Sequence, residues 1–578
     1  MTNTLVLVNS GSPSVADALQ LALPYLDHLG IPYDLLDLLH DTLPADVPAR
    51  PLVVAAQRDL DLRGRRLGRG GAGALAEAVA LGAGLVCFDP ALVLGDESSP
   101  EEGFAPLAES IVVADNGHPI TAHRTSGEVV PLVGHLSVPP LPLSGDTVLL
   151  TAEGRPLLVA RTYGKGRIAR WATLRWAQTK VLGPLAGLDD LLWRSLVWAA
   201  RKPFVMRGLA PIVAMRVDDV AGSGTRWGRS PLSWAGSAVR HGFRPWLGLF
   251  LNNLTQEAVA EARELVERGE ATAFPHAFGR PPRAGGGWHW AEDAPLLRSG
   301  TYDEFIYFDH ERGRPWDDVE AARGLAAVDA WYAAHGPLPI SRYAVAHWYE
   351  LGANTVAHMT DRWGVEFVGK IQDVDAPLRD ETPWLRLGPF RRYERPGSAL
   401  FDPALRGDRP VYYADFVTFG GRRLFNCVTE IRDDAGYEWA PDTDVAATVG
   451  RGVRQLRRAL NSMALAVLFT HETDFIHSIP PDVWDEELAG IWEGVRGYNP
   501  ISMTLDDAVR YVRATRTARL VASNDDGSGA IEATFAGRAD VPTHCYVFVE
   551  GDEGLTGTLA GVPAVGTEAA TWTTTLED

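Results

Sequence analysis

Hydrophobic runs alternate with helix-like segments over residues 1–205. The runs are four or five residues long, as buried strands are, and segment 15–29 has apolar residues at helical spacing. This alternation predicts a parallel sheet whose strands are joined by helices. The expected strands lie at 5–8, 32–36, 51–55 and 85–88. A hairpin is expected within 148–172, where the chain turns at Gly164–Arg167.

Residues 206–515 continue the alternation at greater length. Strand-like runs are expected at 212–217, 246–250, 271–275, 304–308, 340–345, 365–369, 411–417 and 464–469. Helical spacing separates several of them, at Gln256–Arg268, Asp317–Ala334 and Asp444–Asn461. Repeated units of one strand and one helix predict an incomplete (β/α) barrel, in which the chemistry lies at the carboxyl ends of the strands.

The C-terminal segment 516–578 has a different pattern. Gly, Thr, Ala and Asp dominate there, and apolar residues alternate with polar ones in 530–535 and 544–549. At roughly 100–200 residues per domain, a chain of 578 residues is long enough for three or four domains. We therefore expect an α/β domain over 1–205, the barrel over 206–515 and a small β-rich domain over 516–578.

Composition and charge narrow the classes of partner. The fractions of hydrophobic (46%) and charged (22%) residues are those of an ordinary globular protein. A net charge of −20 disfavours nucleic acids and anionic membranes as partners, and it is compatible with a neutral or cationic substrate.

Cysteine usage and the N-terminal residues predict the cellular location. The three cysteines, Cys87, Cys427 and Cys545, have no zinc-type spacing and do not suggest a disulfide framework. The chain begins without a basic, apolar leader, and no apolar stretch has the roughly 18 residues of a membrane span. We expect a cytoplasmic protein without a membrane partner.

Two adjacent aspartates, Asp218 and Asp219, end the apolar run 212–217. Carboxylates at the end of a strand can divide the work of a hydrolase, because one can bind a cation while the other takes a proton from water. A bare Asp-Asp pair is otherwise a solvated turn or a helix cap. The later histidines favour the first interpretation.

Four histidines follow later strand-like runs: His276, His310, His347 and His471. Neutral imidazole is a common zinc ligand, and a histidine can also donate a proton to a leaving group. Each of these residues alone could equally form a structural hydrogen bond. Their shared placement after strands predicts a metal-assisted hydrolase.

The segment 206–515 resembles the polysaccharide-deacetylase (NodB-type) homology domain. The resemblance rests on Val217-Asp218-Asp219 after a strand, on His276 about 60 residues later and on the late motif Leu468-Phe469-Thr470-His471. It implies an incomplete (β/α) barrel that binds a divalent metal, often zinc, and that removes acetyl groups from N-acetylated sugars. Asp218 would be the general base, Asp219 and His276 metal ligands, and His471 the group that assists the leaving amine.

The chain departs from this family at one position. The family usually has a second histidine four residues after the first, and Arg280 stands there. The third ligand would then come from His289, His310 or His347. We favour His310 or His347, because strand ends are held more rigidly than the Gly-rich loop beside His289.

The N-terminal segment resembles flavodoxin-like and class I glutamine-amidotransferase-like domains, in part through the hairpin at Gly164–Arg167. Active members of the amidotransferase class place a cysteine on a tight turn between small residues. Cys87 lies in Leu-Val-Cys-Phe-Asp-Pro, which lacks the glycines for such a turn. We expect a non-catalytic domain that could serve substrate access or association of the chain into a homo-oligomer.

The leading hypothesis is a zinc-dependent hydrolase that N-deacetylates an amino-sugar oligosaccharide or polysaccharide. A glycoside hydrolase is the first alternative; it would need no ion and would pair Asp218 or Asp219 with Glu430 or Glu472. A carbohydrate-binding protein without catalytic activity is the second alternative. The chain's 18 tryptophans suit any of these functions, because sugars stack on indole rings, although tryptophans also serve core packing.

Overall fold

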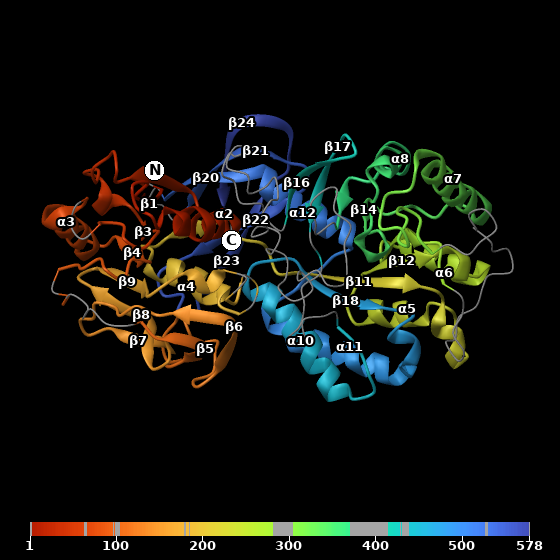
Figure 1. The fold of residues 1–578 in the computed structure, drawn as a ribbon, viewed down its shortest axis with the longest axis horizontal. Helices are drawn as coiled ribbons and strands as arrows, with labels where there is room; N and C mark the ends of the chain where they lie inside the picture. The colour runs from red at the N-terminus through yellow and green to blue at the C-terminus, as the bar shows by residue number, and fades with distance from the viewer. Residues whose placement is uncertain are drawn as a thin grey trace. The chain divides into compact units, whose positions relative to one another are not determined.

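The structure is a computed structural model, and its chain forms two compact units (Figure 1). Unit 1 contains Met1–Ala210 and Ala514–Asp578, and unit 2 contains Pro211–Ser398 and Tyr413–Arg513. The structure describes residues 3–576 except 63–65, 96, 99–104, 179–180, 184, 186, 281–303, 370–413, 428, 430–438 and 526–529.

A nine-stranded sheet forms the main part of unit 1. Its order is β2 (Tyr33–Asp37), β1 (Thr4–Val8), β3 (Leu52–Ala55), β4 (Gly84–Cys87), β9 (Gly166–Trp171), β8 (Arg155–Tyr163), β7 (Thr147–Ala152), β5 (Leu107–Val113) and β6 (Val129–Ser137). The pairings from β2 to β9 are parallel, and those from β9 to β6 are antiparallel. The predicted strands and the predicted hairpin are all present. The helices include α2 (Leu23–Leu29), α3 (Gly68–Ala80) and α4 (Asp189–Ala199).

The C-terminal strands belong to unit 1, whereas the sequence pattern suggested a separate domain over 516–578. β10 (Phe204–Met206) pairs with β22 (Thr543–Phe548), which pairs with β23 (Thr558–Val562). A second sheet has the order β20 (Ala518–Asp525), β21 (Ile531–Ala539) and β24 (Val565–Leu576). Val205 shares a hydrophobic core with residues of both sheets, which explains why this segment packs with the first 210 residues.

Two sheets form the framework of unit 2. The first has the order β13 (Thr272–Ala277), β12 (Pro245–Phe250), β11 (Ile212–Val220) and β18 (Ala466–His471), all parallel, and β19 (Ile501–Ser502) also pairs with β11. The second has the order β14 (Tyr343–Ala344), β15 (Phe367–Val368), β17 (Arg422–Cys427) and β16 (Ala414–Phe419), with β16 and β17 antiparallel. The incomplete barrel stays a prediction, because the described strands form two sheets instead of one continuous sheet.

Helices accompany the strands of unit 2, and those expected from the sequence are present within one or two residues of their predicted ends. The expected helices are α6 (Gln256–Glu267), α7 (Asp318–His335) and α10 (Val445–Asn461). Further described helices of unit 2 are α5 (Ser233–Arg240), α8 (Val356–Trp363), α11 (Pro481–Val495) and α12 (Leu505–Thr517).

One predicted strand of unit 2 is absent. Residues 304–308 do not pair in a sheet, and 306–308 form bends. The carbonyl of Glu304 accepts a hydrogen bond from the N–H of Phe278, and the hydroxyl of Tyr307 donates to the carbonyl of Pro275. The segment therefore runs beside the end of β13 without forming a ladder, which places Glu304 close to the end of that strand.

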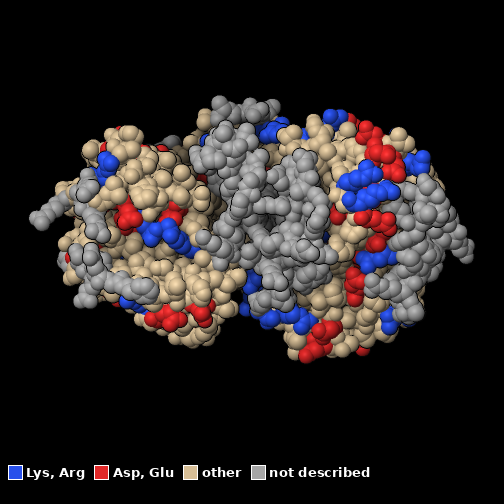
Figure 2. Space-filling view, viewed as in Figure 1, with Lys and Arg blue, Asp and Glu red and all other residues tan. Residues whose placement is uncertain are grey.

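Acidic and basic side chains lie next to one another on the face of unit 2 seen in Figure 2. Among the described residues, no helix is both long enough and apolar enough to cross a membrane.

Candidate metal centre

The two adjacent carboxylates at the end of β11 both face the same imidazole. In a regular strand, neighbouring side chains point to opposite faces. Asp219 departs from regular geometry with a φ of 58°, and the register between β11 and β12 shifts between Val217 and Val220. Nε2 of His276 consequently lies 3.5 Å from Oδ1 of Asp219 and 3.8 Å from Oδ2 of Asp218. The bulge allows two consecutive residues to act on one site.

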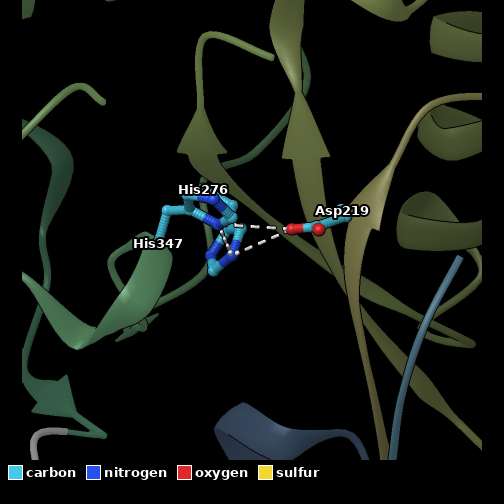
Figure 3. A group of neighbouring side chains, drawn as sticks. All are labelled: Asp219, His276 and His347. Atoms are coloured by element: carbon cyan, nitrogen blue, oxygen red, sulfur yellow. Dashed lines mark hydrogen bonds and ion pairs between the residues drawn. The ribbon is translucent and has the colours of Figure 1, made fainter. Parts of the chain in front are cut away.

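Asp219, His276 and His347 converge from three segments of unit 2 (Figure 3). His276 lies on β13, and His347 lies just after β14. Oδ1 of Asp219 is 3.3 Å from Nδ1 of His347, and that nitrogen is 3.1 Å from Nε2 of His276. All three side chains are buried. Three potential ligand atoms therefore meet at one protected point.

The second nitrogen of each imidazole has a partner that sets its protonation. Nδ1 of His276 lies 2.8 Å from the carbonyl oxygen of Val345, which can only accept a hydrogen bond. Nε2 of His347 lies 2.9 Å from Oε1 of Glu304, a carboxylate that favours a proton on this nitrogen. In the neutral form of each ring, the remaining nitrogen therefore carries the lone pair on the side of Asp219, as in metal-ligating histidines.

The three atoms fit a tetrahedral ion such as zinc. Zinc ligands at about 2.0–2.1 Å from the ion lie about 3.3 Å apart in a tetrahedron. The observed separations of 3.1, 3.3 and 3.5 Å scatter around that value. Oδ1 of Asp219 is buried, and no described residue donates a well-aligned hydrogen bond to it. Three lone pairs at these distances repel one another unless a cation or a proton lies between them.

The pKa shifts of Asp219 and His347 show that the surroundings of these side chains favour a positive charge between them. Burial alone would raise the pKa of Asp219, but His347, His276 and Arg280 hold that pKa well below its usual range. Burial would lower the pKa of His347, but Asp219 and Glu304 outweigh burial and raise it to about 9. Without a metal, a proton on His347 takes the place of the cation.

Zinc affinity should therefore increase with pH. Below a pKa of about 9, His347 must lose its proton before its Nδ1 can bind an ion. The apparent affinity should rise about tenfold per pH unit between about pH 6.5 and 8.5. Competition with a chromophoric chelator at several pH values measures this slope, and an affinity that is constant over the range would contradict the assignment of His347.

Arg280 stands where the resemblance places a second histidine, and it contacts the other oxygen of Asp219. Its Nη2 forms an ion pair with Oδ2 of Asp219, and its Nε lies 2.8 Å from Oε1 of Glu304. The side-chain carbonyl of Asn253 accepts a hydrogen bond from the backbone N–H of Arg280. Arg280 thus orients Asp219 with Oδ1 toward the histidines.

Glu304 is a residue of the site that sequence reasoning missed. Its carboxylate lies within 3 Å of both His347 and Arg280. Neither spacing nor composition singled it out, because 304–308 was expected to be a strand and Glu304 adjoins no other site residue in the sequence.

Glu304→Gln should weaken zinc binding by about 10–100-fold, because the amide no longer favours a proton on Nε2 of His347. Glu350→Gln is a matched control, since Glu350 lies at the same distance, 2.9 Å, from a ring nitrogen of His310. Chelator competition on both variants measures the effect. Equal affinities in the two variants would rule out a role for Glu304 in ion binding.

Asp218 lies beside the three potential ligands and is paired with Arg216. Nε of Arg216 donates to Oδ1 of Asp218 at 2.8 Å, and Nη2 forms an ion pair with Oδ2. Burial would raise the pKa of Asp218, but Arg216, His276 and His471 lower it. The carboxylate is therefore ionised at neutral pH. The sequence held a signal for this pair, because residues two apart on a strand share a face.

His471 is the register partner of Asp218 on the neighbouring strand β18. Side chains at paired positions of parallel strands point to the same face, so the imidazole lies on the same side of the sheet as the carboxylate of Asp218. Burial lowers the pKa of His471, although Asp219 and Asp218 oppose this effect. Its ring is neutral at neutral pH.

The remaining candidates lie elsewhere. Nδ1 of His310 lies 2.9 Å from Oε2 of Glu350, and His310 is not in the group formed by Asp219, His276 and His347.

Glu472, a candidate of the glycoside-hydrolase alternative, accepts hydrogen bonds from the backbone of Ala221–Ser223 and from the side chains of Ser223 and Trp234. Its carboxylate therefore holds the loop that follows β11. His289 and Glu430 lie outside the described residues.

Cys87, the last residue of β4, is buried. Its Sγ contacts the carbonyl of Asp89, and burial raises the pKa of its thiol to about 11. A thiol with this pKa is protonated at neutral pH and is a poor nucleophile. The non-catalytic role of the N-terminal domain stays a prediction.

Comparisons with known proteins show a shared fold. No family model and no curated protein matches the sequence. Agd3, whose structure is described as that of a novel carbohydrate deacetylase, is 12% identical with a TM-score of 0.50, over 100% of this chain and 99% of its own. A cytoplasmic protein from Salmonella typhimurium is 14% identical over 35% of this chain and all of its own, with a TM-score of 0.25. A β-galactosidase from Bacillus circulans sp. alkalophilus is 18% identical over 30% of this chain and 28% of its own, with a TM-score of 0.21. The chain thus shares its overall α/β fold with Agd3.

Proposed function

We propose that this protein is a metal-dependent hydrolase that removes acetyl groups from the amino sugars of an oligosaccharide or polysaccharide. The observation that carries the proposal is the meeting of three buried ligand atoms, from Asp219, His276 and His347, beside the ionised carboxylate of Asp218. The full-length likeness to a protein described as a carbohydrate deacetylase supports the choice of substrate.

Asp219, His276 and His347 would hold the ion, and zinc suits one carboxylate and two imidazoles. Such an ion, when bound, polarises the acyl carbonyl and makes water more acidic. The chain's own contribution begins with Asp218, which accepts the proton of the attacking water. Arg216 fixes that carboxylate and keeps it ionised, so it is ready as a base across the neutral range.

His471 delivers a proton to the departing amine. Its ring is neutral before the reaction and must first take up a proton. Its position beside Asp218 allows the proton removed from water to reach the amine through the imidazole. This transfer returns both groups to their starting states.

Elemental analysis of the purified protein, combined with an acetate-release assay on N-acetylglucosamine oligomers, tests the proposal. We expect close to one zinc ion per chain, loss of activity after chelation and recovery when zinc is added back. Acetate release that survives complete removal of metal would contradict the metal-dependent mechanism. A metal-loaded protein that releases no acetate would contradict deacetylation of these sugars.

A further inference from the structure

The two residues that follow His347 adopt a backbone conformation that side chains other than glycine rarely adopt. Trp348 has a φ of 56° and Tyr349 a φ of 59°. Consecutive bulky residues in the left-handed region are unfavourable, and the surrounding structure must hold them there. Such strain next to a potential metal ligand indicates that the positions of these two side chains matter.

The strained turn sends the two rings to different surroundings. Tyr349 faces inward, where its hydroxyl accepts a hydrogen bond of 2.8 Å from Nη1 of Arg216, the partner of Asp218. Trp348 faces outward, and 42% of its surface is exposed. Its ring centre is 6.2 Å from that of His347. An exposed indole is therefore held at the edge of the metal centre.

His310 lies beside this indole, with 5.2 Å between the ring centres. Its side chain is 40% exposed, and Phe305 stacks on its ring with an interplanar angle of 9°. Because Glu350 accepts the proton of Nδ1, Nε2 of a neutral ring carries the lone pair and can accept a hydrogen bond. An apolar surface and an oriented polar atom thus lie side by side.

We propose that Trp348 and His310 form a binding subsite for the sugar next to the one that loses its acetyl group. The apolar C–H face of a pyranose ring would stack on the indole, and a hydroxyl would donate to Nε2 of His310. This inference rests on the proposed function and requires a substrate with at least two linked pyranoses, one at the metal centre and the next on Trp348.

Scattered exposed hydrophobic residues are normal on protein surfaces, so exposure alone carries no argument. Trp227 is such a residue in the same unit, 37% exposed and packed on the guanidinium of Arg226. Trp348 differs from it in two respects: its backbone is strained, and it directly follows a proposed ligand. Trp227 therefore provides a matched control.

The test compares a hexamer of N-acetylglucosamine with 4-nitrophenyl acetate, a small ester without a sugar. In Trp348→Ala, the ratio of kcat/KM for the hexamer to kcat/KM for the ester should fall about tenfold, as expected for the loss of one aromatic contact. His310→Ala should lower the ratio by about threefold, the effect of one neutral hydrogen bond. Trp348→Phe should keep most of the wild-type ratio, and Trp227→Ala should leave the ratio unchanged.

A binding measurement separates this inference from the proposed function. Calorimetry with the hexamer on an Asp218→Asn background should give a Kd about tenfold higher when Trp348 is also alanine. If the wild type releases acetate but replacing Trp348 with alanine changes neither the ratio nor the Kd, the subsite is overturned and the deacetylase function stands. Trp348-dependent binding without acetate release in the wild type would uphold the subsite and overturn deacetylation. A hexamer that neither binds nor reacts would overturn both.

Discussion

Replacing His347 with alanine should release the ion and lower acetate release at least about 1,000-fold. Lewis-acid assistance supplies several kcal/mol to the transition state, and each 1.36 kcal/mol is about a factor of ten in rate. Nδ1 of His347 is one of three buried ligand atoms, and with it gone only Asp219 and His276 would remain. Zinc content after gel filtration and the rate of acetate release measure the two effects.

His310→Ala is the matched control for metal content. Both histidines contact the ring of Phe305, and both lie 2.9 Å from a glutamate oxygen through one ring nitrogen. Only His347 faces Asp219. The His310 variant should keep its zinc while the His347 variant loses it. Zinc loss in the opposite variant would show that the ion binds elsewhere.

Asp218→Asn should lower kcat by about 100–10,000-fold, the usual contribution of a general base. Asparagine has nearly the same size as aspartate but cannot accept the proton from water. The variant should still bind zinc, because Asp219 and the two histidines are unchanged. Zinc content and kcat therefore respond differently to this substitution, which distinguishes a base from a ligand.

Asp218→Glu supplies the comparison for this prediction, since it restores a carboxylate at a shifted position. It should have more activity than the asparagine variant. A kcat reduced less than tenfold in Asp218→Asn would remove Asp218 from the mechanism. Loss of zinc in Asp218→Asn would show that Asp218 is a ligand of the ion.

Local sequence patterns predicted the strands of this fold that are fully buried. Runs of apolar residues identified β1, β3, β11 and β18, because a fully buried strand needs an apolar side chain at nearly every position. The pattern was misleading at 304–308. This apolar segment pairs with no strand, and the carbonyls of Glu304 and Tyr307 accept hydrogen bonds from the N–H groups of Phe278 and Gly352.

The pairing of distant segments was less predictable. Nothing local reveals that β10 pairs with β22, because Phe204–Met206 is three residues long and its partner begins more than 300 residues later. The C-terminal strands therefore looked like a domain of their own, although they share a hydrophobic core with Val205 and belong to unit 1.

By itself, the sequence determined which residue types could perform chemistry and, for Asp218, Asp219, His276 and His471, that they stand at the ends of strands, because runs of apolar residues locate those ends. Only the tertiary structure decided which of them meet. His310 and His347 have the same placement in the sequence, yet one faces Glu350 and the other Asp219. Metal binding depends on distances of a few ångströms between side chains far apart in the chain, and the packing of unit 2 sets those distances.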